Sequence, residues 1–98
     1  MTQTIWTVIA KSEIGAAIYP QDTASSTDKV EIAKWMEPAL DNGDTLVVIE
    51  ITDHGVVDVT DDMIEFAAAE IIGRDDGKGF QPWVQDTAAY SQYEEEVL

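Results

Sequence analysis

The sequence predicts an α+β fold: a four-stranded antiparallel sheet with two helices packed on one face, followed by an extended acidic C-terminal tail. Two observations lead to this prediction. Residues 5–19 and 45–59 each have the pattern of a strand, a tight turn with glycine where positive φ is needed, and a second strand. Each hairpin then leads into a helical pattern, which gives the order ββα-ββα.

The two predicted hairpins align without gaps at an offset of 40 residues. The identical pairs are Val8 with Val48, Ile9 with Ile49 and Gly15 with Gly55. The helical patterns that follow are offset by only 33 residues, so the first copy carries a longer loop before its helix. We interpret the alignment as a topological pseudo-repeat.

The first helix is expected at residues 28–37. Asp28 is placed to accept hydrogen bonds from the first-turn amides, and Val30, Ala33 and Met36 form an apolar stripe. Pro38 has no amide hydrogen and its ring collides with the preceding turn. The helix should therefore kink or end before Pro38.

The second helix is expected at residues 61–72, with Thr60 as its N-cap. Asp61 and Asp62 complement the positive end of the helix dipole, and one face is lined by the apolar residues Ile64, Ala67, Ala68 and Ile71. Residues 73–98 are expected to form a loop and a C-terminal extension, with an extended segment near residues 80–84 and a short helical turn around residues 88–93. The whole chain, residues 1–98, is expected to form one domain.

The charge of the chain limits its partners. It has 20 aspartates and glutamates against five lysines and arginines, a net charge of −15, while 45% of its residues are apolar. This composition is too hydrophobic for a disordered acidic chain, and its charge disfavours direct binding to nucleic acid or to an anionic membrane. Residues 41–98 hold 15 of the acids and two of the bases, a net charge of −13, so we expect one strongly anionic surface.

Catalytic and metal-binding chemistry is poorly supported. There is no cysteine, and the single histidine, His54, falls in a predicted turn with only Asp53 beside it. The acids at residues 75–76 lack the alternating spacing of a calcium loop. We therefore expect no enzyme activity, no cofactor and no metal site. The start of the chain has no basic segment before its short apolar run, so no signal peptide or membrane span is expected.

The spacing of the carboxylates suggests a binding surface. Residues three or four apart on a helix have Cβ atoms about 5–6 Å apart, and residues two apart on a strand are separated by roughly 6.5 Å. These distances resemble the phosphate spacing of a nucleic-acid strand, so acids on rigid elements can stand in for phosphates. The candidate partner-binding residues are Asp53, Asp58, Asp61, Asp62, Glu65, Asp75 and Asp76.

Individual acids also have simpler interpretations. Helix dipoles account for Asp61 and Asp62, and a turn accounts for Asp53. Adaptation to high salt would explain the surplus as a whole. Self-repulsion at −15 destabilises a compact chain, which favours a functional reason for the surplus.

In size and character the chain resembles the small acidic inhibitors of phages and mobile elements, including anti-CRISPR and anti-restriction proteins that mimic duplex DNA. The resemblance rests on a chain under 100 residues, without cysteine, with a pI near 4.1 and an α/β pattern. It implies a non-catalytic, cytoplasmic inhibitor that occupies the basic DNA-binding groove of a nuclease or CRISPR surveillance complex. The cytoplasm would be that of the host cell if a phage encodes the chain.

A second interpretation remains open. The chain could be an immunity or antitoxin-like protein, or an accessory binding module, whose acidity serves solubility or salt adaptation. Its contact residues would then be Trp83, Tyr90 and Tyr93.

Overall fold

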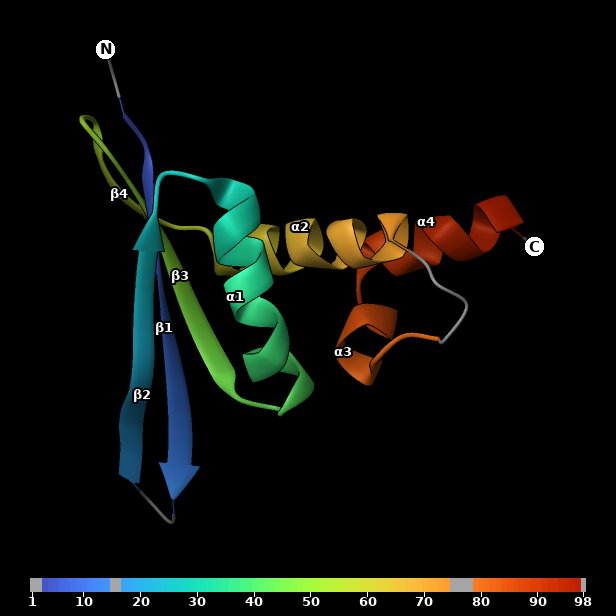
Figure 1. The fold of residues 1–98 in the computed structure, drawn as a ribbon, viewed down its shortest axis with the longest axis horizontal. Coiled ribbons are helices and arrows are strands. Elements are labelled where there is room, and N and C mark those ends of the chain that lie inside the picture. Colours follow the sequence, from blue (N-terminus) through green and yellow to red (C-terminus); the bar gives the residue numbers. More distant parts are fainter. Residues whose placement is uncertain (1–2, 15–16, 75–78, 98) are drawn as a thin grey trace.

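The computed structural model describes residues 3–14, 17–74 and 79–97. Its elements in chain order are β1 (Ile5–Ile14), β2 (Ala17–Ser26), α1 (Lys29–Asp41), β3 (Thr45–Thr52), β4 (Gly55–Asp58), α2 (Thr60–Gly73), α3 (Pro82–Gln85) and α4 (Ala88–Val97). The strands form one sheet in the order β2-β1-β3-β4, and every neighbouring pair is antiparallel. The predicted α+β fold with a four-stranded antiparallel sheet is confirmed (Figure 1).

The hydrophobic core lies between the sheet and the helices. Side chains alternate along a strand, and Val8 of β1 lies opposite Val48 of β3, so both point to the same face. Both are fully buried, as is Met36 of α1, and Met63 of α2 is 1% exposed. The buried cluster consists of Val8, Ala10, Ile32, Met36, Leu46, Val48 and Met63.

The helices lie on one side of the sheet (Figure 1). α1 runs along the sheet and contacts β1, β2 and β3, whereas α2 contacts β3 and then runs away from the sheet behind α1. This arrangement gives a flat molecule with extents of 44 × 42 × 18 Å. Its radius of gyration is 14.6 Å, compared with about 13 Å for a compact domain of this length.

No helix covers the opposite face of the sheet (Figure 1), where six of the ten residues in the three rows below are isoleucine or valine. The register places its side chains in three rows across the strands, because residues opposite one another share a face. The first row is Thr23, Ile9 and Val47; the second is Ser25, Thr7, Ile49 and Asp58; the third is Ile5, Ile51 and Val56. We call these ten residues the open face.

Helix α1 is longer than the sequence predicts. It continues through Pro38 to Asp41, although Pro38 has no N–H to give to the preceding turn. Ala39 and Leu40 pack against the core, and the amide of Asn42 donates to the carbonyl of Pro38. Burial of these two side chains accounts for the continuation.

The C-terminal extension is helical, which corrects the prediction of an extended tail. Residues 82–85 form α3, with Pro82 at its start, and residues 88–97 form α4. α4 packs on α2, and α3 contacts both α1 and α4. None of the helices within the described ranges has the length and apolar character needed to cross a bilayer.

The pseudo-repeat stays a prediction. The element order follows ββα-ββα, and Gly55 has the expected positive φ of 129° in the second turn. However, β4 has four residues where β2 has ten. Gly15, the matching glycine of the first turn, lies outside the described residues.

Truncating the centre of the core should destabilise the fold. Met36→Ala is expected to cost about 2–5 kcal/mol in the free energy of unfolding, because it leaves a cavity in a fully buried site. Val57→Ala, at a side chain that is 58% exposed, should cost less than about 1 kcal/mol. Urea unfolding measures the free energy of unfolding of both variants, provided that the m-value is unchanged. Equal losses of stability in the two variants would contradict this placement of the core.

Candidate acidic binding surface

Most of the acids in the described part of the chain have no cationic partner there. Its two ion pairs are Arg74 with Glu37, and His54 with Asp53 at 3.7 Å. Lys29 instead lies over the ring of Phe66, 4.4 Å from its centroid. The negative charge of the described surface is therefore largely left unneutralised by the chain itself.

Asp58 is held by the junction between β4 and α2. The hydroxyl of Thr60 donates to Asp58 Oδ1 at 2.6 Å, and the Thr60 backbone N–H donates to the same oxygen at 2.9 Å. The Thr60 hydroxyl also accepts from the backbone N–H of Val48 at 2.9 Å. The hydrogen bond from the Thr60 hydroxyl, and to a smaller extent the one from the Thr60 backbone N–H, lowers the pKa of Asp58 below its usual value. Both bonds therefore keep the carboxylate ionised.

This network replaces the N-cap predicted at Thr60. The residue that precedes α2 is Val59, which makes no capping bond with its side chain, and Thr60 is the first residue of the helix. The backbone N–H of Val59 donates to the carbonyl of Val48 at 2.9 Å. The Thr60 hydroxyl is therefore used to tie α2 to β3. An aspartate side chain often accepts from the backbone N–H two residues later, as Asp58 does from Thr60. This spacing is the signal that sequence reasoning missed.

Asp58, Asp61 and Asp62 line one shallow hollow of about 580 Å³, together with Leu46, Val47, Val59 and Thr60. The hollow forms because β4 pairs with β3 only from Ile49 onward, which leaves the earlier part of the β3 edge without a strand beside it. All three aspartates are exposed. We call these three residues the acidic cluster.

Across the described residues, no group of three or more histidines and acids is arranged to hold a metal ion. The three carboxylates therefore face solvent as separate charges around the hollow. Such an arrangement suits several cations on a partner better than one bound ion.

Glu65, which was predicted together with the other partner-binding candidates, lies outside the acidic cluster and accepts hydrogen bonds from another helix. Its Oε2 accepts from the backbone N–H of Ala88 at 2.9 Å, and its Oε1 accepts from that of Ala89 at 3.0 Å. These amides open α4 and have no partner within the helix. Glu65 therefore caps a helix that begins 23 residues later in the sequence.

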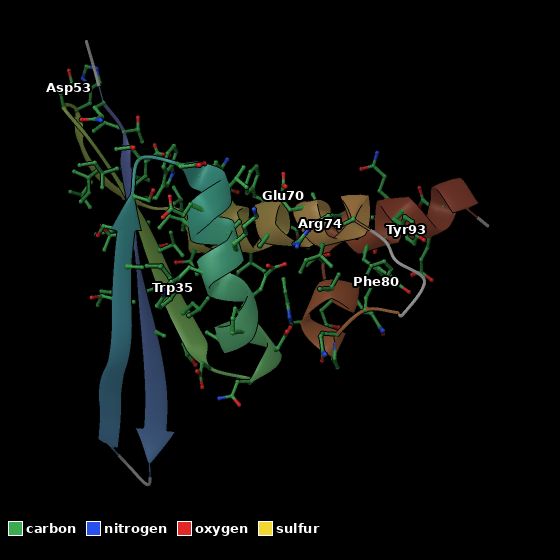
Figure 2. The ribbon with its side chains drawn as sticks, in the orientation of Figure 1. Trp35, Asp53, Glu70, Arg74, Phe80 and Tyr93 are labelled. Atoms are coloured by element: carbon green, nitrogen blue, oxygen red, sulfur yellow. The ribbon has the colours of Figure 1, made fainter. Side chains whose placement is uncertain are left out.

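The remaining predicted residues are not brought into the cluster. Asp53 lies at the tip of the β3–β4 hairpin, at the far end of β4 from Asp58 (Figure 2). The length of β4 puts these two residues on the order of 15 Å apart. Asp75 and Asp76 lie outside the described residues.

The aromatic residues of the alternative interpretation pack within the C-terminal region. Trp83 Nε1 donates to Asp41 Oδ1 at 2.7 Å, which ties α3 to the end of α1. The ring of Phe80 meets those of Tyr90 and Tyr93 edge to face, at centroid distances of 5.7 and 5.6 Å (Figure 2). These contacts give all three residues a structural role.

The charge of Asp58 should make a measurable contribution to stability. Asp58→Asn keeps an accepting oxygen and loses the charge, so wild type should be more stable at neutral pH. The difference should shrink as the pH falls through the lowered pKa of Asp58, below about pH 4, because the protonated carboxyl no longer strengthens the bonds from Thr60. Urea unfolding between neutral and acidic pH measures this difference.

Asp61→Asn is the matched control for this series, since it makes the same change in charge at a side chain with no such pair of bonds. It should destabilise the protein less than Asp58→Asn does. If the stability difference between wild type and Asp58→Asn grew as the pH fell, the proposed contribution of the Asp58 charge to stability would be contradicted.

Removing the Glu65 carboxylate should loosen α4. Glu65→Ala is expected to cost about 0.5–2 kcal/mol, the usual value of a helix N-cap. Glu70→Ala is the matched control on the same helix, because the Glu70 side chain caps no other element, and it should cost less. Hydrogen exchange at the Ala88 and Ala89 amides should accelerate in the Glu65 variant alone, and unchanged exchange there would contradict the cap.

A scan against protein-family models, a search of curated proteins and a search of solved structures each found no match to this chain.

Proposed function

We propose that the protein is a non-catalytic inhibitor that presents carboxylates in place of nucleic-acid phosphates and blocks the DNA-binding groove of a nuclease or CRISPR surveillance complex. The observation that carries this proposal is the acidic cluster: Asp58, Asp61 and Asp62 are exposed around one hollow, and none of them forms an ion pair with another residue that the structure describes. Their natural counterparts are lysine and arginine side chains on another protein.

The charge of the chain supports the same proposal. At −15, its field extends beyond the cluster and accelerates the approach of a basic surface. Binding would release the anions condensed on that surface, as nucleic acid does when it enters the same groove. The partner is therefore a basic nucleic-acid-binding protein, and neither nucleic acid nor a membrane binds the chain directly.

Local structure positions the residues of the cluster. Asp58 is fixed by two hydrogen bonds from Thr60, and Asp61 and Asp62 occupy the first turn of α2. A carboxylate held as that of Asp58 is loses little side-chain entropy on binding, which favours affinity. An inhibitor of this kind acts where its nuclease acts, in the cytoplasm, which is that of the host if a phage encodes the chain.

Charge reversal in the cluster tests the proposal. Asp61→Lys/Asp62→Lys should raise the concentration needed to inhibit DNA cleavage at least about tenfold, or ~1.4 kcal/mol. The assay measures cleavage of a labelled duplex by purified CRISPR surveillance complexes and restriction endonucleases. Inhibition by wild type should be stoichiometric, relieved by excess duplex and weakened as salt rises to about 0.5 M.

Glu94→Lys/Glu95→Lys is the matched control. It changes the net charge by the same amount at exposed positions of α4, and should leave inhibition close to that of wild type. An equal loss in both variants would mean that only bulk charge matters. If the wild-type protein inhibits none of the enzymes tested, the proposal is contradicted. Circular dichroism and urea unfolding check the fold, since each reversal at the start of α2 costs about 0.3–1 kcal/mol through the helix dipole.

A further inference from the structure

One short stretch of β3 lacks a strand on the side where β4 lies. β4 pairs with β3 only over residues 49–52, although β3 begins four residues before that pairing starts. The edge is closed at Val48, whose backbone N–H donates to the Thr60 hydroxyl and whose carbonyl accepts from the backbone N–H of Val59. No strand of the described chain runs beside residues 45–47 on this side. We call residues 45–47 the free edge.

Leu46 supplies the unpaired backbone groups of the free edge. Successive residues of an antiparallel strand turn their N–H and C=O to alternate sides. Val48 directs both groups toward the β4 side, and the register with β1 is continuous, so Leu46 directs its own two groups the same way. No described residue bonds to the Leu46 backbone on that side. Leu46 also lines the hollow of the acidic cluster, so a ligand in the hollow can reach its N–H and its carbonyl.

The acidic cluster flanks the free edge from both sides of the sheet. Asp58 belongs to the open face, whereas Asp61 and Asp62 lie in the first turn of α2, on the side of the helices (Figure 1). All three are exposed around the same hollow. Consecutive side chains of an extended segment point to opposite sides. Two consecutive basic residues on one extended segment can therefore meet carboxylates on both sides of the sheet.

We propose that the free edge binds an extended segment of the partner that carries consecutive lysines or arginines, which adds to the sheet as a short strand beside β3. An unpaired strand edge is a template for another chain, because its N–H and C=O bond to the added strand. The backbone of Leu46 fixes the position of the segment, and the acidic cluster selects its charge. This inference rests on the proposed function, because the segment belongs to the basic partner described there.

The charge of the free edge argues against other occupants. A second copy of the chain would bring two acidic clusters together in a protein of charge −15. A nucleic-acid strand carries phosphates, which the same carboxylates repel. A basic polypeptide is the occupant that satisfies both the backbone of Leu46 and the three aspartates.

A synthetic peptide tests this mode of binding. The peptide has six residues, blocked ends and two central arginines flanked by valine and threonine, and it is titrated into the full chain at low salt. Amide hydrogen exchange of Leu46 should slow at least about fivefold on binding, the effect of one added hydrogen bond of about 1 kcal/mol. The Val48 amide is the internal control, because Thr60 already accepts from it and its exchange should not change. No peptide binding, or binding with unchanged exchange at Leu46, would overturn the proposal.

Backbone methylation provides the matched peptide. The same peptide with both arginine nitrogens methylated keeps its charge and side chains but cannot donate from these positions to the Leu46 carbonyl. It should bind at least about fivefold more weakly. If the two peptides bind equally, charge alone accounts for binding and strand addition is wrong.

The variants of the acidic cluster test the selection of charge. Asp61→Lys/Asp62→Lys should weaken binding of the unmethylated peptide at least about tenfold, and Glu94→Lys/Glu95→Lys should leave it close to that of wild type. An equal loss in the two variants would overturn the position of the site. Slower exchange at Leu46 as the protein alone is concentrated would assign the free edge to a second copy and would also overturn the proposal.

The peptide assay contains no nuclease, so this inference and the proposed function can fail separately. Peptide binding that protects Leu46, without inhibition of any nuclease, would support the free edge as a strand-binding site and contradict the proposed function. Inhibition of a nuclease, without protection of Leu46 by the peptide, would support the proposed function and overturn strand addition.

Discussion

The hydroxyl of Thr60 joins the two halves of this protein. It accepts from the backbone of β3 and donates to Asp58, and so fixes where β4 ends and where α2 begins. The direction of α2 then determines the position of Glu65, which caps α4. The acidic cluster, whose residues flank Thr60, and the C-terminal helices, which follow it, both depend on this junction.

The fold uses part of its negative charge internally. Glu50 accepts from the indole of Trp6 at 3.1 Å, Asp41 accepts from that of Trp83, and Glu65 accepts from two amides. Each of these carboxylates satisfies a donor and forms a tertiary contact. Asp28 and Asp58 accept from nearby residues, and Glu37 pairs with Arg74. A functional surplus of charge is therefore best sought among the acids without such contacts, Asp61 and Asp62 above all.

The sheet and both long helices could be predicted from the sequence because alternation and helical spacing are local signals. The exposure of Asp61 and Asp62 followed from the same reasoning. The position of Glu65 could not be predicted in this way, because helical spacing indicates which residues share a face but not what packs on that face. Helix α4 was predicted only as a short helical turn around residues 88–93, because part of its support comes from Glu65 and Phe80, which no local pattern marks.

The attachment of α3 and α4 has a consequence for the dynamics of the chain. These helices are anchored on α1 and α2, at a distance from the buried cluster that joins α1 to the sheet. Proteins open in cooperative units, and a unit held by few buried contacts opens at a lower free energy than the whole. Val84 is the one fully buried residue described in α3 and α4. We therefore expect these helices to detach and re-form at a lower free energy than global unfolding, while the sheet and the Thr60 junction stay intact.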